Sequence, residues 1–303
     1  MKILITGAGG MLGTDLVLRL AAKHDVVGSG RRPAPHLNIT FHQGNLANMK
    51  TTFDLVKAEK PEVILHAASM TEVDRCESER RAALLDNFEA TRNVVDAGNR
   101  AGAFIIHFGT DFVFDGTKPS PYREDDIPHP ISVYGETKLL GERYVLLRAK
   151  RFVIVRSSWL FGKQGDDFPK KIIRQAEAGK QIRVVADQFG NPTYTRDLAG
   201  AVGQLLEEVL SSGSGREKQI YHITNDGTLS RYEFARMVLR KKHLSSELVS
   251  PISSEEGQFP ARRPQNSALS NERVKQRFGI QLRPLEEALD AYLQELVSPS
   301  LSL

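Results

Sequence analysis

The sequence is short of cysteine, tryptophan and long apolar runs, and each shortage excludes a class of protein. Among its 303 residues there is one cysteine and one tryptophan. The single Cys76 cannot form an internal disulfide, which favours a reducing compartment, so we expect a cytoplasmic location. No run approaches the roughly 18 consecutive apolar residues of a membrane span, and the apolar start is too short for a secretory signal. We therefore expect no membrane segment.

Charge is also modest. The formal net charge is +4, and the basic residues are scattered through the chain. This pattern weighs against nucleic acid as a partner but leaves room for an anionic small molecule. The 8 histidines show no metal-ligand spacing, so we expect no metal.

Short apolar runs alternate with helical patterns through the first half of the chain. Strands are predicted at residues 2–6, 25–29, 62–67, 103–108 and 152–156, and helices at 11–23, 53–60, 80–100 and 134–150. Near-continuous apolar strands separated by helices are typical of a parallel sheet covered on both faces. With right-handed crossovers they form a doubly wound α/β domain.

The alternation of strands and helices becomes less regular beyond Trp159. Further strands are predicted at residues 182–185 and 220–224, and helices at 196–210, 231–241 and 285–297. The Ser- and Gly-rich residues 211–215 are typical of a flexible surface loop. We predict that residues 1–160 form the doubly wound domain. Residues 161–303 then form mainly a smaller lobe over the carboxyl edge of the sheet, with some segments returning to the first domain.

A glycine-rich segment, Gly7-Ala8-Gly9-Gly10-Met11-Leu12-Gly13, lies between the first predicted strand and the first predicted helix. Glycine permits a tight turn and lets a bulky anion approach the backbone. The helix N-terminus then offers free N–H groups to a pyrophosphate. In this context the segment indicates dinucleotide binding, the alternative being a purely structural turn.

Two arginines follow the second predicted strand. A site that prefers NAD usually has an acidic residue at this point, whereas arginine accommodates the 2′-phosphate of NADP. Arg31 and Arg32 have no acidic residue beside them in the sequence, which favours NADP. The alternative is a pair of solvated surface arginines.

Tyr134 and Lys138 are four residues apart on a predicted helix, so they share one face. An ammonium nearby, together with an oxidised nicotinamide, is expected to lower the pKa of the phenol from about 10. Tyr134 could then act as a general acid toward a carbonyl oxygen. Thr110, at the carboxyl end of the strand at 103–108, could donate a hydrogen bond to the same oxygen.

Together these features resemble the extended short-chain dehydrogenase/reductase superfamily, and longer strings resemble its dTDP-4-dehydrorhamnose reductase branch. The matching segments run from the first strand to the last helix. Beyond the glycine-rich first turn they are Gly109-Thr110-Asp111-Phe112-Val113-Phe114-Asp115-Gly116, Pro121-Tyr122-Arg123-Glu124, Val133-Tyr134-Gly135-Glu136-Thr137-Lys138-Leu139, Arg156-Ser157-Ser158-Trp159, Asp187-Gln188-Phe189-Gly190-Asn191-Pro192-Thr193, Pro260-Ala261-Arg262-Arg263-Pro264 and Ser267-Ala268-Leu269.

The resemblance implies a Rossmann-like fold and reduction of a nucleotide-linked 4-keto-6-deoxyhexose to dTDP-L-rhamnose, with NADPH as cofactor and NADH as the alternative. It implies Thr110, Tyr134 and Lys138 as catalytic residues, and Thr110, Asp111 and Trp159 as contacts to the sugar. Arg262 or Arg263 is the expected partner of the diphosphate. The cofactor would be lined by Gly7, Gly10, Met11, Leu12, Gly13, Arg31, Arg32, Asn45, Leu46, Ala67, Ala68, Ser69, Tyr134 and Lys138.

Some positions depart from the family pattern. Asn45 stands where an aspartate is common, and His66 where an asparagine is frequent. Met70 and Ser132 also differ, and both could lie near the sugar, so they leave the identity of the sugar open.

Two alternatives to a reductase remain. A sugar-nucleotide epimerase or dehydratase of the same superfamily would act without net consumption of cofactor. A non-catalytic NADP-binding subunit, resembling the regulatory subunit of methionine adenosyltransferase, would keep the same residues while serving a partner protein. The sequence leaves a homodimer open.

Overall fold

The computed structural model describes residues 1–211 and 218–297. Residues 212–215 of the predicted surface loop lie outside this part of the chain. Within the described residues, no helix is both long and apolar enough to cross a membrane.

The centre of the protein is a parallel sheet of 7 strands in the order β11-β6-β5-β4-β1-β2-β3. The strands are β1 (Lys2–Thr6), β2 (Asp25–Gly30), β3 (Thr40–Gln43), β4 (Val63–His66), β5 (Phe104–Thr110), β6 (Phe152–Ser157) and β11 (Lys218–His222). Their apolar runs are buried because helices cover both faces. The predicted doubly wound, Rossmann-like α/β fold is thereby confirmed.

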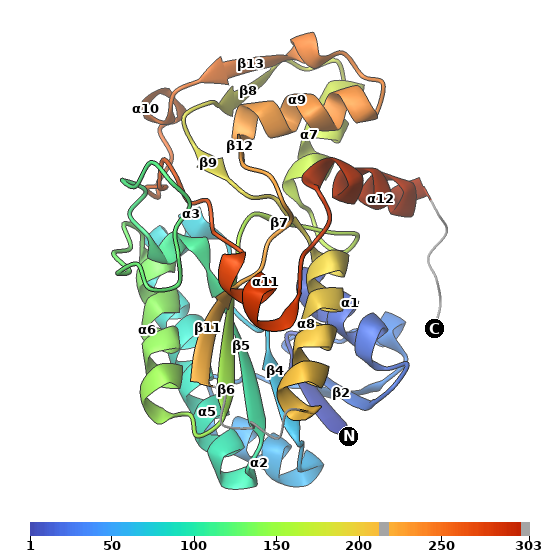
Figure 1. Cartoon of the computed structure of the whole chain (residues 1–303), viewed down its shortest axis with the longest axis vertical. Helices are drawn as coiled ribbons and strands as arrows, with labels where there is room; N and C mark the ends of the chain where they lie inside the picture. The colour runs from blue at the N-terminus through green and yellow to red at the C-terminus, as the bar shows by residue number, and fades with distance from the viewer. Residues whose placement is uncertain (212–217, 298–303) are drawn as a thin grey trace.

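Two groups of helices cover the sheet (Figure 1). On one face α1 (Met11–Leu20) packs against α8 (Thr195–Ser211) over the largest apolar core. On the other face lie α2 (Met49–Glu59), α5 (Ala90–Ala101) and α6 (Val133–Arg148). The chain order turns from β1 toward β2 and β3 on one side and toward β4 and β5 on the other. Ligands of open α/β sheets bind at this reversal, beyond the carboxyl ends of the strands.

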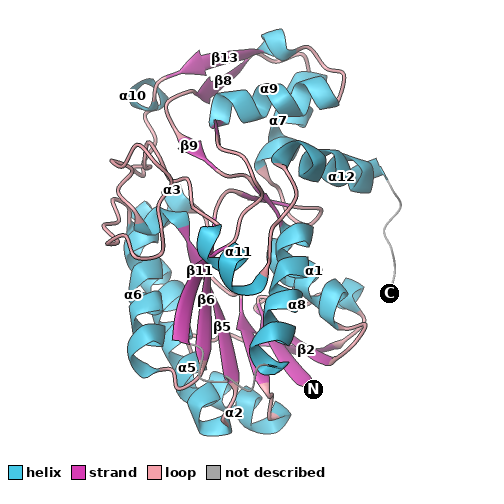
Figure 2. Ribbon diagram, in the orientation of Figure 1, coloured by secondary structure: helices cyan, strands magenta, loops and turns pink. Residues whose placement is uncertain are grey.

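A second lobe stands over that edge (Figure 2). Its own apolar core packs α7 (Phe168–Glu177), α9 (Arg231–Lys241) and α12 (Leu285–Val297) against β8 (Ile182–Val185) and β13 (Val249–Ile252). The lobe also contains β9 (Phe189–Gly190), β12 (Leu229–Ser230) and α10 (Ser254–Gly257). Two short strands, β7 (Leu160–Phe161) and β10 (Thr193–Tyr194), pair in parallel where the chain enters and leaves it. The later elements α8 and β11 return to the large sheet domain.

Several elements differ from the sequence expectation. α2 begins at Met49, where the Asn48 side chain accepts a hydrogen bond from the Thr51 amide and caps the helix. β3, α3 (Val73–Ser78), β13 and α11 (Glu272–Phe278) were not predicted, because they are short. α7 was also not predicted, although Pro169, Ile172, Ile173 and Ala176 recur at helical spacing along it.

The predicted single helix at 80–100 is interrupted. α4 (Arg80–Leu84) and α5 are joined by a π-helical turn over Leu85–Glu89. Such turns are frequent at functional sites. Here the turn brings Asp86 to a pocket, and it lets Asn87 exchange hydrogen bonds with the backbone of Met70. The sequence interpretation treated residues 80–100 as one continuous helix and so did not identify the extra residue in this turn.

Candidate functional site

Two adjoining pockets open at the carboxyl edge of the sheet. One of about 210 Å³ lies beside the ends of β1, β2 and β4, and the other, of about 450 Å³, extends under the second lobe. Both are lined by Gly7, Gly10, Ala67 and Ser69, so they form one continuous site. Every residue to which the sequence assigned a catalytic or binding role lines one of the two pockets, except Arg262. Met70 and Ser132, which the sequence allowed near the sugar, line neither of the two.

The glycine-rich segment is shaped to admit a large group close to the backbone. A Cβ at Gly13 would lie 2.1 Å from the carbonyl oxygen of Gly7, so no other residue fits where the turn passes into α1. Gly10 caps α1 without a side-chain hydrogen bond, which leaves the first amides of the helix directed at the pocket. These residues therefore fit a pyrophosphate-containing cofactor.

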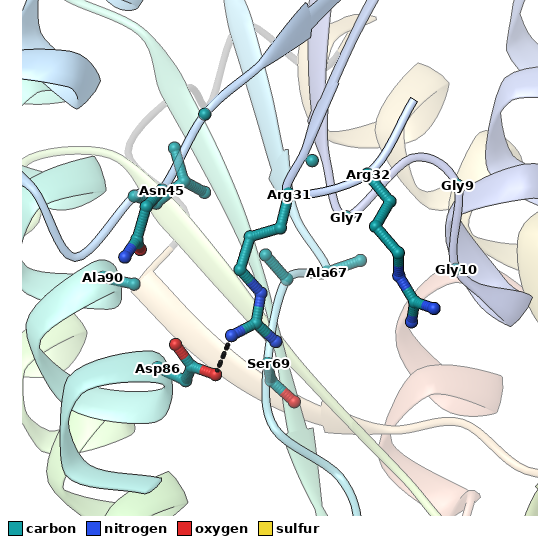
Figure 3. Close-up of a pocket in the computed structure, with 14 residues that line it drawn as sticks. Gly7, Gly9, Gly10, Arg31, Arg32, Asn45, Ala67, Ser69, Asp86 and Ala90 are labelled. Carbon is teal, nitrogen blue, oxygen red and sulfur yellow. Dashed lines mark hydrogen bonds and ion pairs between the residues drawn. The ribbon is translucent and has the colours of Figure 1, made fainter. Parts of the chain in front are cut away.

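The two arginines after β2 both line the smaller pocket but have different surroundings. Figure 3 shows Arg31 directed toward Asp86, with its Nη1 donating to the carboxylate at 2.7 Å. Arg32 has no hydrogen-bond or ion-pair partner in the described part of the chain. Asp86 is an acidic residue beside Arg31 that the sequence could not reveal, since the π-helical turn supplies it from a different element.

Close packing brings Thr110 and Tyr134 together. Thr110 is the last residue of β5 and leads into the short helix η3 (Asp111–Val113), while Tyr134 lies in the first turn of α6. A Cβ at Gly135 would lie 2.2 Å from the carbonyl oxygen of Phe112, so glycine lets α6 meet η3 at this point. The Ser132 hydroxyl fixes the start of α6 by accepting from the Gly135 amide at 3.2 Å.

Lys138 lies one turn beyond Tyr134, with its ammonium buried. Its Nζ donates to the carbonyl oxygen of Phe108 in β5 at 2.6 Å. Burial lowers the pKa of Lys138 to about 8, while the negative charge of Glu142 opposes this shift. The lysine is therefore held against the central strand, and its charged form is less favoured than in an exposed lysine.

The pKa of Tyr134 is set mainly by its burial. Burial raises it above its ordinary value, and a hydrogen bond with Thr110 offsets only part of this effect. Desolvation of the phenolate dominates in the protein without cofactor, and the lowering of this pKa by Lys138 together with an oxidised nicotinamide stays a prediction. A phenol in this state keeps its proton at neutral pH and can give it to a substrate.

Asp111 and Trp159 face the larger pocket with Thr110 and Tyr134. Asp111 is buried, and burial raises its pKa to about 6. Trp159 has a left-handed backbone with a φ of 47°, a strained conformation for a non-glycine residue that is most often retained at functional sites. Arg231 covers its ring at 3.6 Å from guanidinium carbon to ring centroid. One face of the indole is thus occupied, which the expected contact of Trp159 with the sugar did not foresee.

The two C-terminal arginines lie in different places. Arg262 is exposed and lines a separate pocket of about 420 Å³. Arg263 lines both this pocket and the larger pocket of the site, and it is bound to Asp74 through hydrogen bonds of 2.7 and 3.0 Å. In the described residues, no three His, Cys, Asp or Glu side chains gather as they would around a metal ion.

Sequence reasoning missed Arg231 and Asp86 among the residues that line the site. Ser230 and Glu233 form a capping box, whose Ser-x-x-Glu spacing could have marked the start of α9. That signal would still not have shown that Arg231 reaches a pocket built from β5, β6 and α6.

Comparison with known proteins agrees with this geometry. The family described as RmlD substrate binding domain matches residues 1–298. A dTDP-4-dehydrorhamnose reductase from Burkholderia thailandensis is 36% identical over 98% of this chain and 100% of the relative. Another from Aggregatibacter actinomycetemcomitans is 36% identical over 95% of this chain and 97% of the relative. The crystal structure of the reductase from Bacillus anthracis in complex with NADP has a TM-score of 0.88 and 32% identity, covering 97% of this chain and 99% of that one.

The fold and the site define a short-chain dehydrogenase/reductase with an extended second lobe. Within that class, the chain belongs to the RmlD family, whose curated relatives include the dTDP-4-dehydrorhamnose reductases.

Proposed function

We propose that this protein is an NADPH-dependent dTDP-4-dehydrorhamnose reductase, which reduces the 4-keto group of dTDP-4-dehydro-L-rhamnose to give dTDP-L-rhamnose. The observation that carries the proposal is the convergence of Thr110, Tyr134 and Lys138 on one pocket that continues into the glycine-rich cofactor pocket. The reductase names of relatives that match nearly the full chain favour this activity over an epimerase, a dehydratase or a regulatory subunit.

The proposed roles follow from the chemistry of each side chain. NADPH supplies the hydride when it is bound. Tyr134, kept protonated by its buried position, gives its proton to the oxygen at C4 as negative charge develops there. The hydroxyl of Thr110, which donates to Asp111 Oδ1 at 3.1 Å in the structure, turns to donate a hydrogen bond to the same oxygen. Lys138, anchored on Phe108, holds the cofactor's ribose and adds positive charge beside the phenol.

Asp111 and Trp159 contact the sugar in this proposal, and the residues around the smaller pocket bind the cofactor. Arg31 and Arg32 favour NADPH, with NADH as the weaker substitute. The large sheet domain, residues 1–160, is the dinucleotide-binding unit, and residues 161–303 form mainly the substrate lobe with α8 and β11 returning to the sheet. The proposal includes a cytoplasmic location and leaves the homodimer as an expectation of the sequence.

The test is consumption of NADPH with dTDP-4-dehydro-L-rhamnose as substrate. We expect stoichiometric oxidation of NADPH, and we expect Tyr134→Phe to lower kcat by roughly 10²–10⁴-fold because a general acid is lost. Conversion of a sugar nucleotide without net NADPH oxidation would instead identify an epimerase or dehydratase. A wild-type protein inert toward the keto sugar would refute the reductase.

A further inference from the structure

Arg231 is a second-lobe arginine that neither the sequence nor the family resemblance nominated. It is the first residue of α9, and it lines the same pocket as Thr110, Tyr134 and Trp159. Two features hold it in place. The Ser230 capping box fixes the start of the helix, and the Arg231 amide donates to the carbonyl oxygen of Gln188 at 3.1 Å.

The guanidinium of Arg231 is held by aromatic rings and not by an acid. It lies 3.6 Å from the ring centroid of Trp159 and 5.3 Å from that of Phe168. Through residues 1–211 and 218–297, no hydrogen bond or ion pair involves its side chain. Stacking fixes the plane of a guanidinium while its N–H groups stay available at the edge, which suits bidentate binding of a phosphate.

The charge of Arg231 is incompletely balanced. The carboxylate of Asp111 acts on it electrostatically but forms no ion pair with it, and the neighbouring charge of Arg263 repels it. Burial lowers the pKa of Arg231 to about 9, so the guanidinium remains charged at neutral pH. Arg231 is half-buried, and a charged group partly withdrawn from water without a close counterion is costly, so a bound anion would lower that cost.

The other arginines nearby are less suited to an anion in this pocket. Asp74 already engages Arg263 through both guanidinium nitrogens Nη1 and Nη2, and Nη1 also donates to the carbonyl oxygen of Ala261 at 3.1 Å. Arg262 does not line the pocket. Lys138 is committed to Phe108.

We infer that Arg231 binds the diphosphate of the nucleotide sugar, with Trp159 as the platform that orients its guanidinium. The inference rests on the proposed function, since it names the residue of that site that recognises the anionic part of the substrate. It replaces the expectation from the sequence that Arg262 or Arg263 has this role.

Trp159 provides a direct readout, because it is the single tryptophan of the chain. Thymidine diphosphate and thymidine are titrated separately into the full-length protein with saturating NADP⁺, and the change in tryptophan fluorescence gives each affinity. We expect Arg231→Gln to weaken binding of thymidine diphosphate by roughly 10- to 100-fold, the value of a charge-assisted hydrogen bond, and to leave thymidine binding almost unchanged. With keto sugar as substrate, KM should rise more than kcat falls.

Three further variants make the test specific. Arg240→Gln, on an exposed position of the same helix, should behave as wild type. Arg231→Lys should recover part of the affinity for the diphosphate, because it restores the charge without the planar fork. Isothermal titration repeats each measurement without the tryptophan, so a changed fluorescence yield cannot imitate a loss of binding.

The inference is overturned if Arg231→Gln binds thymidine diphosphate as wild type does, or if Arg262→Gln carries the loss instead. It is also overturned if Arg231→Gln weakens thymidine and thymidine diphosphate equally, since that result indicates a disturbed pocket. Failure of the proposed function looks different, because the wild-type protein itself would then not oxidise NADPH with the keto sugar, whatever the affinity of Arg231→Gln for thymidine diphosphate.

Discussion

The ammonium of Lys138 donates to the carbonyl oxygen of Phe108 at 2.6 Å, which ties the helix that carries Tyr134 to the central strand that ends in Thr110. This bond places an ammonium, a phenol and a hydroxyl around one end of the pocket before any ligand arrives. It also makes the protonation of Lys138 a control on the site.

The pH dependence of activity should reflect that control. Because burial lowers the pKa of Lys138 to about 8, the ammonium is present below this pH and lost above it. We expect kcat/KM to fall as pH rises through about 8, measured as initial rates across pH 6–10. Lys138→Arg keeps its positive charge at high pH, so the fall in kcat/KM should move to higher pH, whatever the absolute activity of the variant. An unchanged limb in that variant would assign it to another group.

Cofactor preference should depend on the contact between Arg31 and Asp86. Asp86→Asn releases Arg31 from its 2.7 Å ion pair, so we expect the ratio of kcat/KM for NADPH over NADH to increase. Arg32→Gln removes the unpaired guanidinium and should lower the same ratio by roughly 10-fold or more, as expected for a lost charge-assisted phosphate contact. The values for NADH serve as the internal control. If neither variant changes the ratio of kcat/KM for NADPH over NADH, the 2′-phosphate does not bind at these residues.

Buried His66 should make the protein sensitive to acid. Burial lowers its pKa from 6.5 to about 3, and its ring contacts the hydroxyls of Thr6 and Thr91 at 2.8 and 3.1 Å. Below about pH 6.5, His66 binds a proton in the unfolded chain but not in the folded chain. The free energy of unfolding therefore decreases as pH falls toward 3. The contribution is about 1.4 kcal/mol per pH unit.

The comparison of wild type with His66→Asn isolates this effect. Asparagine keeps hydrogen-bonding groups but does not titrate, so urea unfolding should show a shallower loss of stability between pH 6 and 4. His107 and His222 remain in both proteins, and so do Asp15 and Asp111, whose raised pKa values act in the opposite direction. Parallel pH curves for the two proteins would contradict the prediction.

A buried ion pair below the site should be costly to break. Arg156 donates from Nε to Glu142 at 3.0 Å and from Nη2 to the other carboxylate oxygen, and both side chains are 1% exposed. Glu142→Gln leaves a buried guanidinium without its acid, so the free energy of unfolding should fall by about 3–5 kcal/mol. Because Glu142 also raises the pKa of Lys138, the alkaline limb of activity should move to lower pH.

Glu136→Gln is the matched control on the same helix. Its carboxylate is exposed and meets Arg80 only at 3.5 Å, so the change in stability should stay within about 0.5 kcal/mol. Equal losses for the two variants would show that burial of the Glu142–Arg156 pair is not what stabilises this region.

The sequence by itself determined the doubly wound fold and most of the residues around the pockets. Strands such as β4 and β6 are continuous apolar runs, and the glycine-rich segment, the Tyr-x-x-x-Lys spacing and Thr110 are local patterns. Local patterns can be recognised without the tertiary structure, because their geometry is set by one helix, one strand or one turn.

Only the tertiary structure decided which charges meet. Asp86 reaches Arg31 through a π-helical turn, and Arg231 reaches Trp159 from a helix of the other lobe, although nothing in their separate segments indicates these contacts. The raised pKa of Tyr134 was likewise not visible in the sequence, because it depends on how much water the folded chain removes from the phenol. Burial and long-range charge are properties of packing, which brings distant segments together, and so they were decided by the fold as a whole.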